Sequence, residues 1–290
     1  MSAPQIIDNA HSPIRELIAY ETLWANKSAS VKSIGELFRK SGKLPSEIAG
    51  NRHIPELETY FADLFSNPQV GYNIGFMHRG HAMYPARLGD TQHHIEGVYY
   101  SGDLSLLSGT GIAIVGTRKP SADGVLRAKK MAKLLVGDGL TIVSGLAEGI
   151  DTAAHQAAIE NGGRTIAVIG TPLHKFYPKS NSGLQQFIAQ HHLLLSQVPF
   201  YHYQHIPFTQ QKLFFAERNK MMSALSHATI IIEAGATSGT LIQGKAALDQ
   251  GRKLFILDSC FGNTSVEWPV RFQEKGAIRV KTYEDILKNL

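Results

Sequence analysis

The chain has 290 residues, of which 43% are hydrophobic and 18% charged, a composition typical of globular proteins. Its net charge of +5 is uneven, because residues 1–108 hold 9 Lys/Arg against 11 Asp/Glu and residues 109–290 hold 20 against 13, as expected of a polyanion binder. No apolar run approaches the roughly 18–20 residues that cross a bilayer, the amino terminus lacks a secretory signal pattern, and the only cysteine is Cys260. We therefore expect a cytoplasmic protein without a membrane segment, a disulfide or a metal site.

Residues 1–70 are predicted to form a small helical domain, because apolar residues recur there at helical spacing in three stretches. The stretches begin at Ile14, Val31 and Ile54, and the second one stops at Gly42. Nothing in them has catalytic character, so the default expectation is a packing or protein-contact role. Residues 71–108 are richer in glycine, tyrosine and turn signals and are predicted to be an extended connector with one or two strands.

Residues 109–290 alternate between short apolar runs and amphipathic stretches. The runs predict strands that begin near residues 113, 141, 165, 193, 229, 253 and 277. Continuous apolar strands separated by helices are typical of an α/β fold with a doubly wound, mostly parallel sheet. We therefore predict one Rossmann-like domain over residues 109–290.

Four of these strands end in loops of small residues, which predicts an anion-binding crevice. The carboxyl ends of parallel strands meet at one edge of the sheet, so the four loops should converge there. Loops without Cβ atoms expose backbone N–H groups, and the helices that follow point their positive ends outward, so phosphate is favoured. The expected donors are Gly116, Thr117, Ser144, Gly145, Ser238, Gly239 and Thr240.

The same loops argue against a bound nucleotide cofactor. The first loop, Gly116-Thr117-Arg118, is not G-x-G-x-x-G, and Ser144 stands after the second strand where an acidic residue would hold a ribose. The sequence also has no G-x-x-x-x-G-K-[ST] loop. We therefore expect no cofactor.

Basic and aromatic residues are interleaved just before the fifth strand of this region, a pattern suited to single-stranded nucleic acid. The candidate residues are Lys212, Phe215, Arg218, Asn219 and Lys220. Phe214 and Phe215 cannot both face the same way, so we expect one in the core and one exposed, although core packing is the commoner outcome for either taken alone. Lys175 and Lys179 either extend the basic surface or are simply solvated loop lysines.

The carboxylates near the crevice are expected to be structural. Asp151 and His155 lie four residues apart at a helix start, but an aspartate there normally offsets the helix dipole and caps free N–H groups. Glu233 ends a strand, and the loop after it lacks the PGGxGTxxE pattern of related nucleotide hydrolases. We therefore expect no catalytic residue and no enzyme activity.

Several blocks of sequence, in order, resemble the DNA-processing protein A family, also called Smf. They run through residues 84–290 and include VSGLAEGIDTAAHQAAIENGGRTIAVIG, LFFAERNKMMSALS and IIIEAGATSGTLIQGKAALDQGRKLFIL. The resemblance implies a Rossmann-like core that binds single-stranded DNA, helps to load the RecA recombinase onto it, chiefly in natural transformation, and usually forms a dimer. The apolar run Leu254–Leu257 is the segment that we expect to border the dimer surface.

Carried over residue by residue, the resemblance places the family's arginine after the first strand at Arg118. Its guanidinium would contact a phosphate, unless it closes its own loop against Asp123 or Asp151. The resemblance also makes Phe215 the residue on which a base would stack.

The chain departs from the family pattern in two ways. Glu217 precedes Arg218, and Lys220 replaces an arginine, which is expected to loosen the contact with DNA. The sequence ends at Leu290, where many members continue into a winged-helix domain, so no such domain is expected.

Three functions stay open at this point. The leading one is a non-catalytic single-stranded DNA binder that mediates recombination. The second is an enzyme that acts on a nucleotide or nucleoside phosphate in the crevice. The third is a nucleotide-sensing module whose output is the helical domain.

Overall fold

The computed structural model describes residues 13–262 and 265–290. The expected absence of a secretory signal concerns mostly residues 1–12, which lie outside the described residues. Within the described ranges, no helix combines the length and the apolar character needed to span a bilayer.

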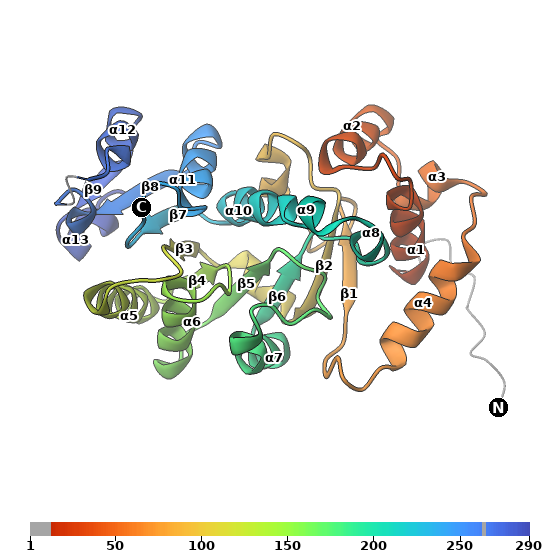
Figure 1. Ribbon diagram of the computed structural model, residues 1–290, viewed down its shortest axis with the longest axis horizontal. Coiled ribbons are helices and arrows are strands. Elements are labelled where there is room, and N and C mark those ends of the chain that lie inside the picture. Colours follow the sequence, from red (N-terminus) through yellow and green to blue (C-terminus); the bar gives the residue numbers. More distant parts are fainter. Residues whose placement is uncertain (1–12, 263–264) are drawn as a thin grey trace.

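One nine-stranded sheet runs through the described part of the chain (Figure 1). Its strands are β1 Gly75–His78, β2 Gly97–Gly102, β3 Gly111–Val115, β4 Thr141–Ser144, β5 Thr165–Ile169, β6 Leu193–Ser196, β7 Ala228–Ile231, β8 Lys253–Leu257 and β9 Ile278–Val280. The order across the sheet is β1-β2-β6-β5-β4-β3-β7-β8-β9, and all pairs from β6 to β9 are parallel. The predicted doubly wound, mostly parallel sheet is confirmed.

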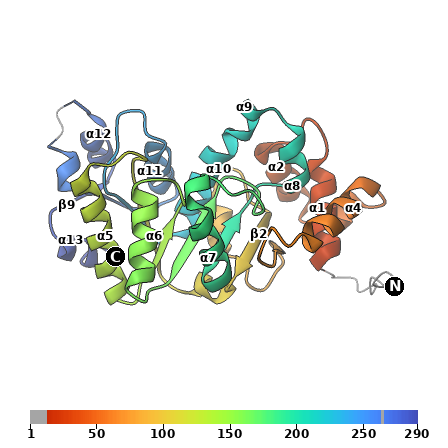
Figure 2. The same cartoon turned by 60° about the horizontal axis from the view of Figure 1, so that its bottom comes forward.

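Helices cover both faces of the parallel strands. The α-helices are α1 Pro13–Trp24, α2 Val31–Ser41, α3 Pro45–Ala49, α4 Pro55–Ser66, α5 Ala122–Gly137, α6 Ile150–Glu160, α7 Ser182–His191, α8 Phe200–His205, α9 Phe208–Gln211, α10 Leu213–Leu225, α11 Thr240–Asp249, α12 Trp268–Glu274 and α13 Tyr283–Leu287. Short 3₁₀ helices span Ala86–Asp90, Leu104–Ser108, Lys179–Asn181 and Asp258–Cys260. Helices α5, α6 and α7 lie on one side of the sheet and α10 and α11 on the other (Figures 1 and 2). Burial on both faces explains why these strands are mostly apolar.

Strands β1 and β2 arise from the segment 71–108 and extend the sheet at one edge. They pair antiparallel with each other, and β2 pairs antiparallel with β6, with Tyr99 opposite Ser196. The segment therefore contains two strands, as expected, and they belong to the same sheet as the parallel strands. The division of the chain at residues 70 and 108 stays a prediction.

The amino-terminal helices pack against this edge of the sheet. The three predicted apolar stretches form α1, α2 and α4, and α2 ends at Gly42, whose φ of 64° favours glycine. The ring of Tyr20 in α1 lies 5.2 Å from that of Phe76 in β1, measured between centroids. One continuous hydrophobic cluster contains residues of these helices and of β2, β5 and β6.

A buried carboxylate ties α1 to the core at the same place. Glu21 has no exposed surface, and its side chain accepts hydrogen bonds from the Tyr99 hydroxyl at 2.5 Å and from the backbone N–H groups of Phe200 at 2.7 Å and Tyr201 at 3.1 Å. Burial raises the pKa of Glu21 to about 7, and these hydrogen bonds oppose the shift. Three donors from two different segments thus converge on one side chain of α1.

The apolar run Leu254–Leu257 does not border an exposed surface, which corrects the sequence-based expectation. It forms most of β8, which lies between β7 and β9 inside the sheet. Leu254, Phe255 and Ile256 have no exposed surface, and Leu257 is 8% exposed. The run is apolar because helices cover both of its faces.

Candidate nucleic-acid interface

The four predicted loops converge on one crevice beside α10. Strands β3 and β7 are neighbours, but the helices that follow them, α5 and α11, pack on opposite faces of the sheet, so a gap opens between the two loops. A cavity of about 530 Å³ occupies this gap, and a hollow of about 40 Å³ lies beside it, bounded by the loops after β4 and β5. The predicted residues that line the larger cavity are Gly116, Thr117, Arg118, Arg218, Asn219, Ser238, Gly239 and Thr240.

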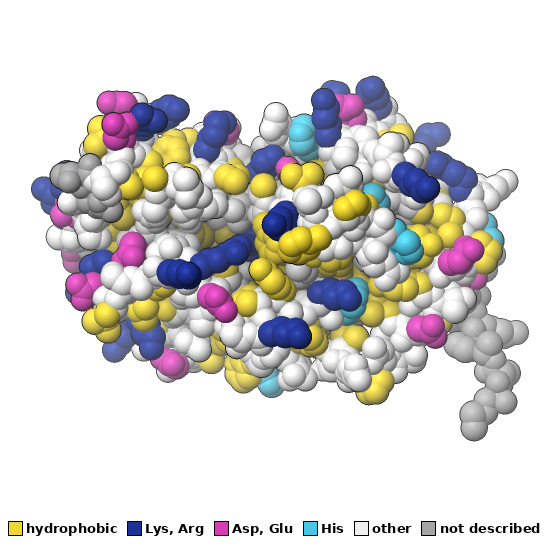
Figure 3. Space-filling model, viewed as in Figure 1, with side chains coloured by type: hydrophobic (Ala, Val, Ile, Leu, Met, Phe, Trp, Pro, Cys, Tyr) yellow, Lys and Arg dark blue, Asp and Glu magenta, His cyan; other side chains and the backbone are white. Residues whose placement is uncertain are grey.

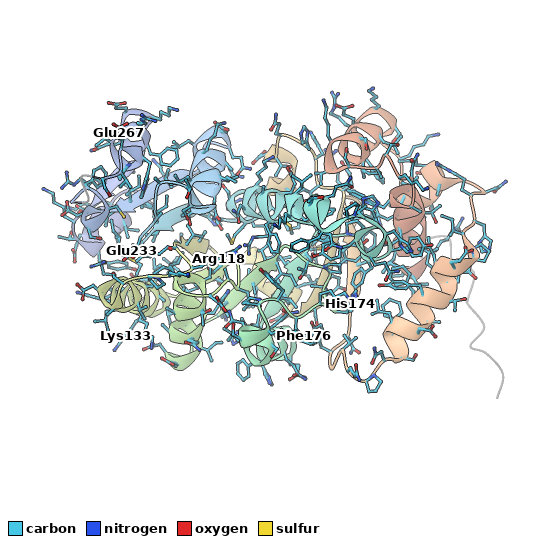
Figure 4. The ribbon with its side chains drawn as sticks, in the orientation of Figure 1. Arg118, Lys133, His174, Phe176, Glu233 and Glu267 are labelled. Atoms are coloured by element: carbon cyan, nitrogen blue, oxygen red, sulfur yellow. The ribbon has the colours of Figure 1, made fainter. Side chains whose placement is uncertain are left out.

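A carboxylate of the protein already occupies one helix N-terminus at this edge. Glu233 accepts hydrogen bonds from the Ser121 backbone N–H at 2.9 Å and the Ser121 hydroxyl at 2.6 Å, directly before α5, and lies 3.4 Å from Arg127. Figure 4 shows Glu233 on the side of the crevice toward α5. The positive end of the α5 dipole is therefore neutralised within the protein, so α5 is not available to phosphate.

Asp151 also serves an internal purpose, as expected. It is 5% exposed and accepts hydrogen bonds from the backbone N–H groups of Gly145 at 3.2 Å and Ala147 at 3.3 Å. Burial raises its pKa, and the Arg218 charge opposes that rise. His155 is fully buried, its Nδ1 lies 2.7 Å from the Thr165 hydroxyl, and its Nε2 has no hydrogen-bond partner among the described residues, so it is not hydrogen-bonded to Asp151.

Arg218 is buried beneath the crevice, with 5% of its surface exposed. One guanidinium nitrogen donates hydrogen bonds to the carbonyl oxygens of Gly145 and Val168, which joins the loop after β4 to β5. A Cβ at Gly145 would collide with this guanidinium, so glycine is required there. The Nε atom of Arg218 has no partner within the described protein. Burial lowers the pKa of Arg218, Asp151 opposes this, and the positive charge of Arg118 lowers it further.

Arg118 is exposed at the mouth of the crevice, between the two cavities. Its guanidinium carbon lies 6.0 Å from the centroid of the Phe215 ring, and the Tyr177 ring lies 5.5 Å from the same ring. Phe214 is 5% exposed and lies in the core, as expected for one of the two side chains, whereas Phe215 is half-buried and not fully exposed. Among the described residues, Arg118 forms no salt bridge with any aspartate or glutamate.

The predicted lysines differ in their surroundings. Lys212 is exposed, and its Nζ lies 4.7 Å from the centroid of the Phe208 ring. Lys175 is exposed on the loop after β5 and lines neither cavity. Lys220 forms a salt bridge of 2.7 Å with Glu217. The Lys220 charge is therefore partly neutralised, whereas those of Lys175 and Lys212 face solvent.

Ser144 and Gly145 do not offer free donors, which corrects the expectation that they bind an anion. Ser144 has no exposed surface, and its hydroxyl donates to the Ile114 carbonyl at 2.7 Å. The Gly145 N–H is held by Asp151. Both residues stabilise the floor of the crevice by joining neighbouring strands and loops.

The loop after β7 closes the other side of the crevice. The Thr240 hydroxyl donates to the Gly116 carbonyl at 3.0 Å, and the Ser238 hydroxyl donates to Thr240 at 2.9 Å. The Asn219 side-chain amide donates to the Gly239 carbonyl at 3.0 Å, which attaches this loop to α10. These contacts fix the width of the crevice between the loops after β3 and β7.

Lysine and arginine side chains gather on the face that holds the crevice, next to hydrophobic ones (Figure 3). Two residues that line the cavities were not among the residues predicted from the sequence. Lys119 lines the larger cavity, and Tyr177 lines the smaller one and is 48% exposed. The sequence signal for Lys119 is its position next to Arg118, and that for Tyr177 is its position between Lys175 and Lys179. Among the described residues, no group of histidine, cysteine, aspartate or glutamate is arranged to hold a metal ion.

A family model described as DNA recombination-mediator protein A matches residues 75–290. The DNA processing protein DprA of Streptococcus pneumoniae (strain ATCC BAA-255 / R6) is 40% identical over 193 residues, which cover 66% of this chain and 65% of that protein. Protein Smf of Escherichia coli (strain K12) is 35% identical over 208 residues, which cover 71% of this chain and 54% of that protein. The chain thus spans less than two thirds of the length of these relatives.

Solved structures agree with the sequence comparison. The X-ray structure of DprA from Streptococcus pneumoniae matches with a TM-score of 0.76 and 29% identity, covering 95% of this chain and 98% of that one. DNA processing protein A from Helicobacter pylori, described for its unique single-stranded DNA binding mode, matches with a TM-score of 0.65 and 26% identity, covering 76% and 96%.

Proposed function

The chain belongs to the DNA recombination-mediator protein A family, and on that premise we propose that it binds single-stranded DNA without catalysis and helps to load a RecA-type recombinase. The resemblance seen in the sequence blocks is thereby confirmed. A structural neighbour from Helicobacter pylori that binds single-stranded DNA supports the choice of ligand. The reducing cytoplasm is the proposed location, in keeping with a single cysteine.

The observation that carries the proposal is the pair of Arg118 and Phe215 at the crevice mouth. An exposed guanidinium without a carboxylate partner is a ready contact for a phosphate. The half-buried Phe215 ring lies next to it and is the aromatic group on which we propose that an unstacked base stacks. Arg118 and the buried Arg218 both line the larger cavity, and the positive charge of Arg118 contributes to lowering the pKa of Arg218, so an anion bound there would offset the repulsion between the two. Duplex DNA keeps its bases stacked, so it would gain nothing from Phe215.

The lack of catalysis is proposed because the candidate acids and nucleophile are engaged elsewhere. Asp151 and Glu233 both accept backbone N–H groups that would otherwise be free. Cys260 is buried, and burial raises the pKa of its thiol to about 12, so it is not a thiolate at neutral pH.

The cavity itself favours a second candidate function. Its volume of about 530 Å³ falls in the range of small-molecule sites, and it lies where α/β sheets hold nucleotides. A nucleotide-processing enzyme or a nucleotide-sensing module would use the same crevice. Product formation from nucleoside monophosphates, ATP or NAD, lost in Asp151→Asn or Glu233→Gln, would support the enzyme over the DNA binder.

A homodimer is also part of the proposal. Strand β8 is buried, so the shared surface has to lie elsewhere. Exposed apolar residues are found on α11 and α12, which pack together, namely Ile242 at 41% and Val270 at 52%. A two-fold dimer through such a surface would give one DNA strand two crevices to bridge.

Titration of single-stranded DNA by fluorescence anisotropy tests the proposed function. We expect tight binding that falls with salt, by about 0.7 log units per tenfold change in salt for each phosphate neutralised, and weaker binding of duplex DNA. Arg118→Ala should weaken binding about tenfold with an unchanged melting temperature. Arg39→Ala, an exposed arginine on α2, is the matched control. Absence of binding at about 50 mM salt, or equal binding by wild type and Arg118→Ala, would contradict the proposal.

A further inference from the structure

Helices α9 and α10 form one nearly continuous helical segment that leads away from the crevice. Lys212, between them, has φ −61° and ψ −25°, which is helical. The Lys212 N–H donates to the Phe208 carbonyl, and the Phe215 N–H donates to the Lys212 carbonyl, both at 3.2 Å. Residues at i, i+4 and i+7 of a helix share one face, so Phe208, Lys212 and Phe215 follow one another along that face.

This helical face begins in the crevice and ends on an exposed aromatic ring. Asn219 lines the larger cavity and Phe215 the smaller one. Lys212 is exposed, and Phe208 is exposed to 66%, an unusual degree for a phenylalanine. The Lys212 ammonium lies against the Phe208 ring, and none of the salt bridges among the described residues involves Lys212. Figure 3 shows basic and hydrophobic side chains side by side over this part of the molecule.

The spacing along the helix suits a single nucleic-acid strand. A rise of 1.5 Å per residue separates Phe208 from Phe215 by roughly 10 Å along the axis, which is the length of two or three stacked nucleotides at about 3.4 Å each. A cation between two aromatic rings is the arrangement that single strands need, with charge for the phosphates and flat faces for the bases. The positive charge and the aromatic face together favour a single nucleic-acid strand over a protein partner. A protein would need both a carboxylate to pair with Lys212 and an apolar surface to cover Phe208.

We propose that Phe208, supported by Lys212, is a second stacking platform that holds a base two or three nucleotides beyond the one at Phe215. The proposal rests on the proposed function, because it assumes that single-stranded DNA enters the crevice. It fixes the direction of the strand: out of the crevice, along α10 and over α9 toward the amino-terminal helices.

Oligonucleotide length separates the platform from the crevice. We expect Phe208→Ala to weaken binding of an oligothymidylate of about twenty nucleotides by roughly fivefold or more, and to leave binding of a thymidine dinucleotide, which is too short to reach from Phe215 to Phe208, unaffected. Phe208→Leu keeps the apolar character without the aromatic face and should lose as much as alanine. Phe187→Ala, which removes a 42% exposed phenylalanine on α7, is the control. In Phe208→Trp, quenching of the new indole fluorescence by the long oligonucleotide, and not by the short one, reports stacking directly.

The failure of the platform and the failure of the crevice give different results. If wild type binds both oligonucleotides and Phe208→Ala matches it on the long one, the platform is refuted and the proposed function stands. The same holds if Phe208→Leu binds like wild type, since the ring would then act only as apolar surface, as it would for a protein partner. If wild type binds neither oligonucleotide, both proposals fall.

Discussion

The junction around Glu21 and the crevice around Arg118 both place an ionisable side chain beside aromatic rings, but the surroundings of the two groups are opposite. At the junction, the Glu21 carboxylate is fully buried and receives three hydrogen bonds from the protein. At the crevice, the Arg118 guanidinium is exposed and faces Phe215 without a carboxylate among the described residues. The first arrangement satisfies the carboxyl oxygens with donors of the protein and so ties α1 to the sheet. The second leaves its charge for a ligand and contributes little to folding.

Glu21→Ala gives the largest effect that this contrast predicts. The substitution leaves the Tyr99 hydroxyl and the Phe200 and Tyr201 N–H groups buried without an acceptor, which should lower the free energy of unfolding by about 3 kcal/mol. Arg118→Ala should change it by less than about 0.5 kcal/mol. Urea unfolding of both variants, followed by circular dichroism, measures the difference. Equal stability of Glu21→Ala and Arg118→Ala would contradict the comparison. Glu56→Ala, which removes an exposed carboxylate on α4, controls for the loss of a charge.

The pH dependence of stability should sharpen the comparison at the junction. Burial raises the pKa of Glu21 from 4.5 to about 7, so the folded state holds a proton that the unfolded chain releases. The free energy of unfolding that this bound proton contributes is fully present below about pH 4.5. It is lost as the pH rises toward 7, by roughly 3 kcal/mol at most. Glu21→Gln cannot ionise, so its stability relative to wild type should rise over the same interval. Parallel stability profiles for wild type and Glu21→Gln between pH 5 and 8, by urea unfolding, would contradict the assignment.

The smallest expected effect lies at the rim of the crevice, where Lys220 is paired with Glu217. Glu217→Gln removes the carboxylate 2.7 Å from the Lys220 ammonium and so releases a cation for phosphate. Binding of single-stranded DNA should tighten about threefold at low salt, and the salt dependence should steepen by about 0.7. Anisotropy titrations at several salt concentrations measure both. Weaker binding by the variant would contradict this prediction, because it would mean that Glu217 holds the Lys220 ammonium in place for the DNA and does not neutralise it.

The sequence predicted the parallel strands and the place of the crevice because both have local signals. An apolar run followed by small residues marks a buried strand and its loop, whatever the rest of the chain does. The alternation of Phe214 and Phe215 likewise follows from helical geometry alone. The family resemblance placed an arginine of the site at Arg118, and the structure shows that this side chain is exposed at the mouth of the crevice.

The errors arose where the same residues fit two different surroundings in the folded protein. Ser144 looks the same in a sequence whether its hydroxyl faces a crevice or, as here, the Ile114 carbonyl on the neighbouring strand. The run Leu254–Leu257 has the apolar composition that an interior strand and an interface segment share, so the sequence alone does not separate the two. The strand order does, because it places β9 at the edge of the sheet and β8 in its interior. Long-range pairing decides both cases.

The antiparallel pairing of β2 with β6 also shapes how the chain assembles during synthesis. Tyr99 pairs with Ser196, so β2 emerges from the ribosome about a hundred residues before its partner, a delay of roughly 5–20 s at ordinary translation rates. Until β6 arrives, the β1–β2 hairpin has an open edge and the aromatic side chains of α1 have only part of their core. Non-local pairing of this kind slows folding and exposes strand edges. Chaperones would therefore be most needed during the period in which the amino-terminal part of the chain has been synthesised and β6 has not.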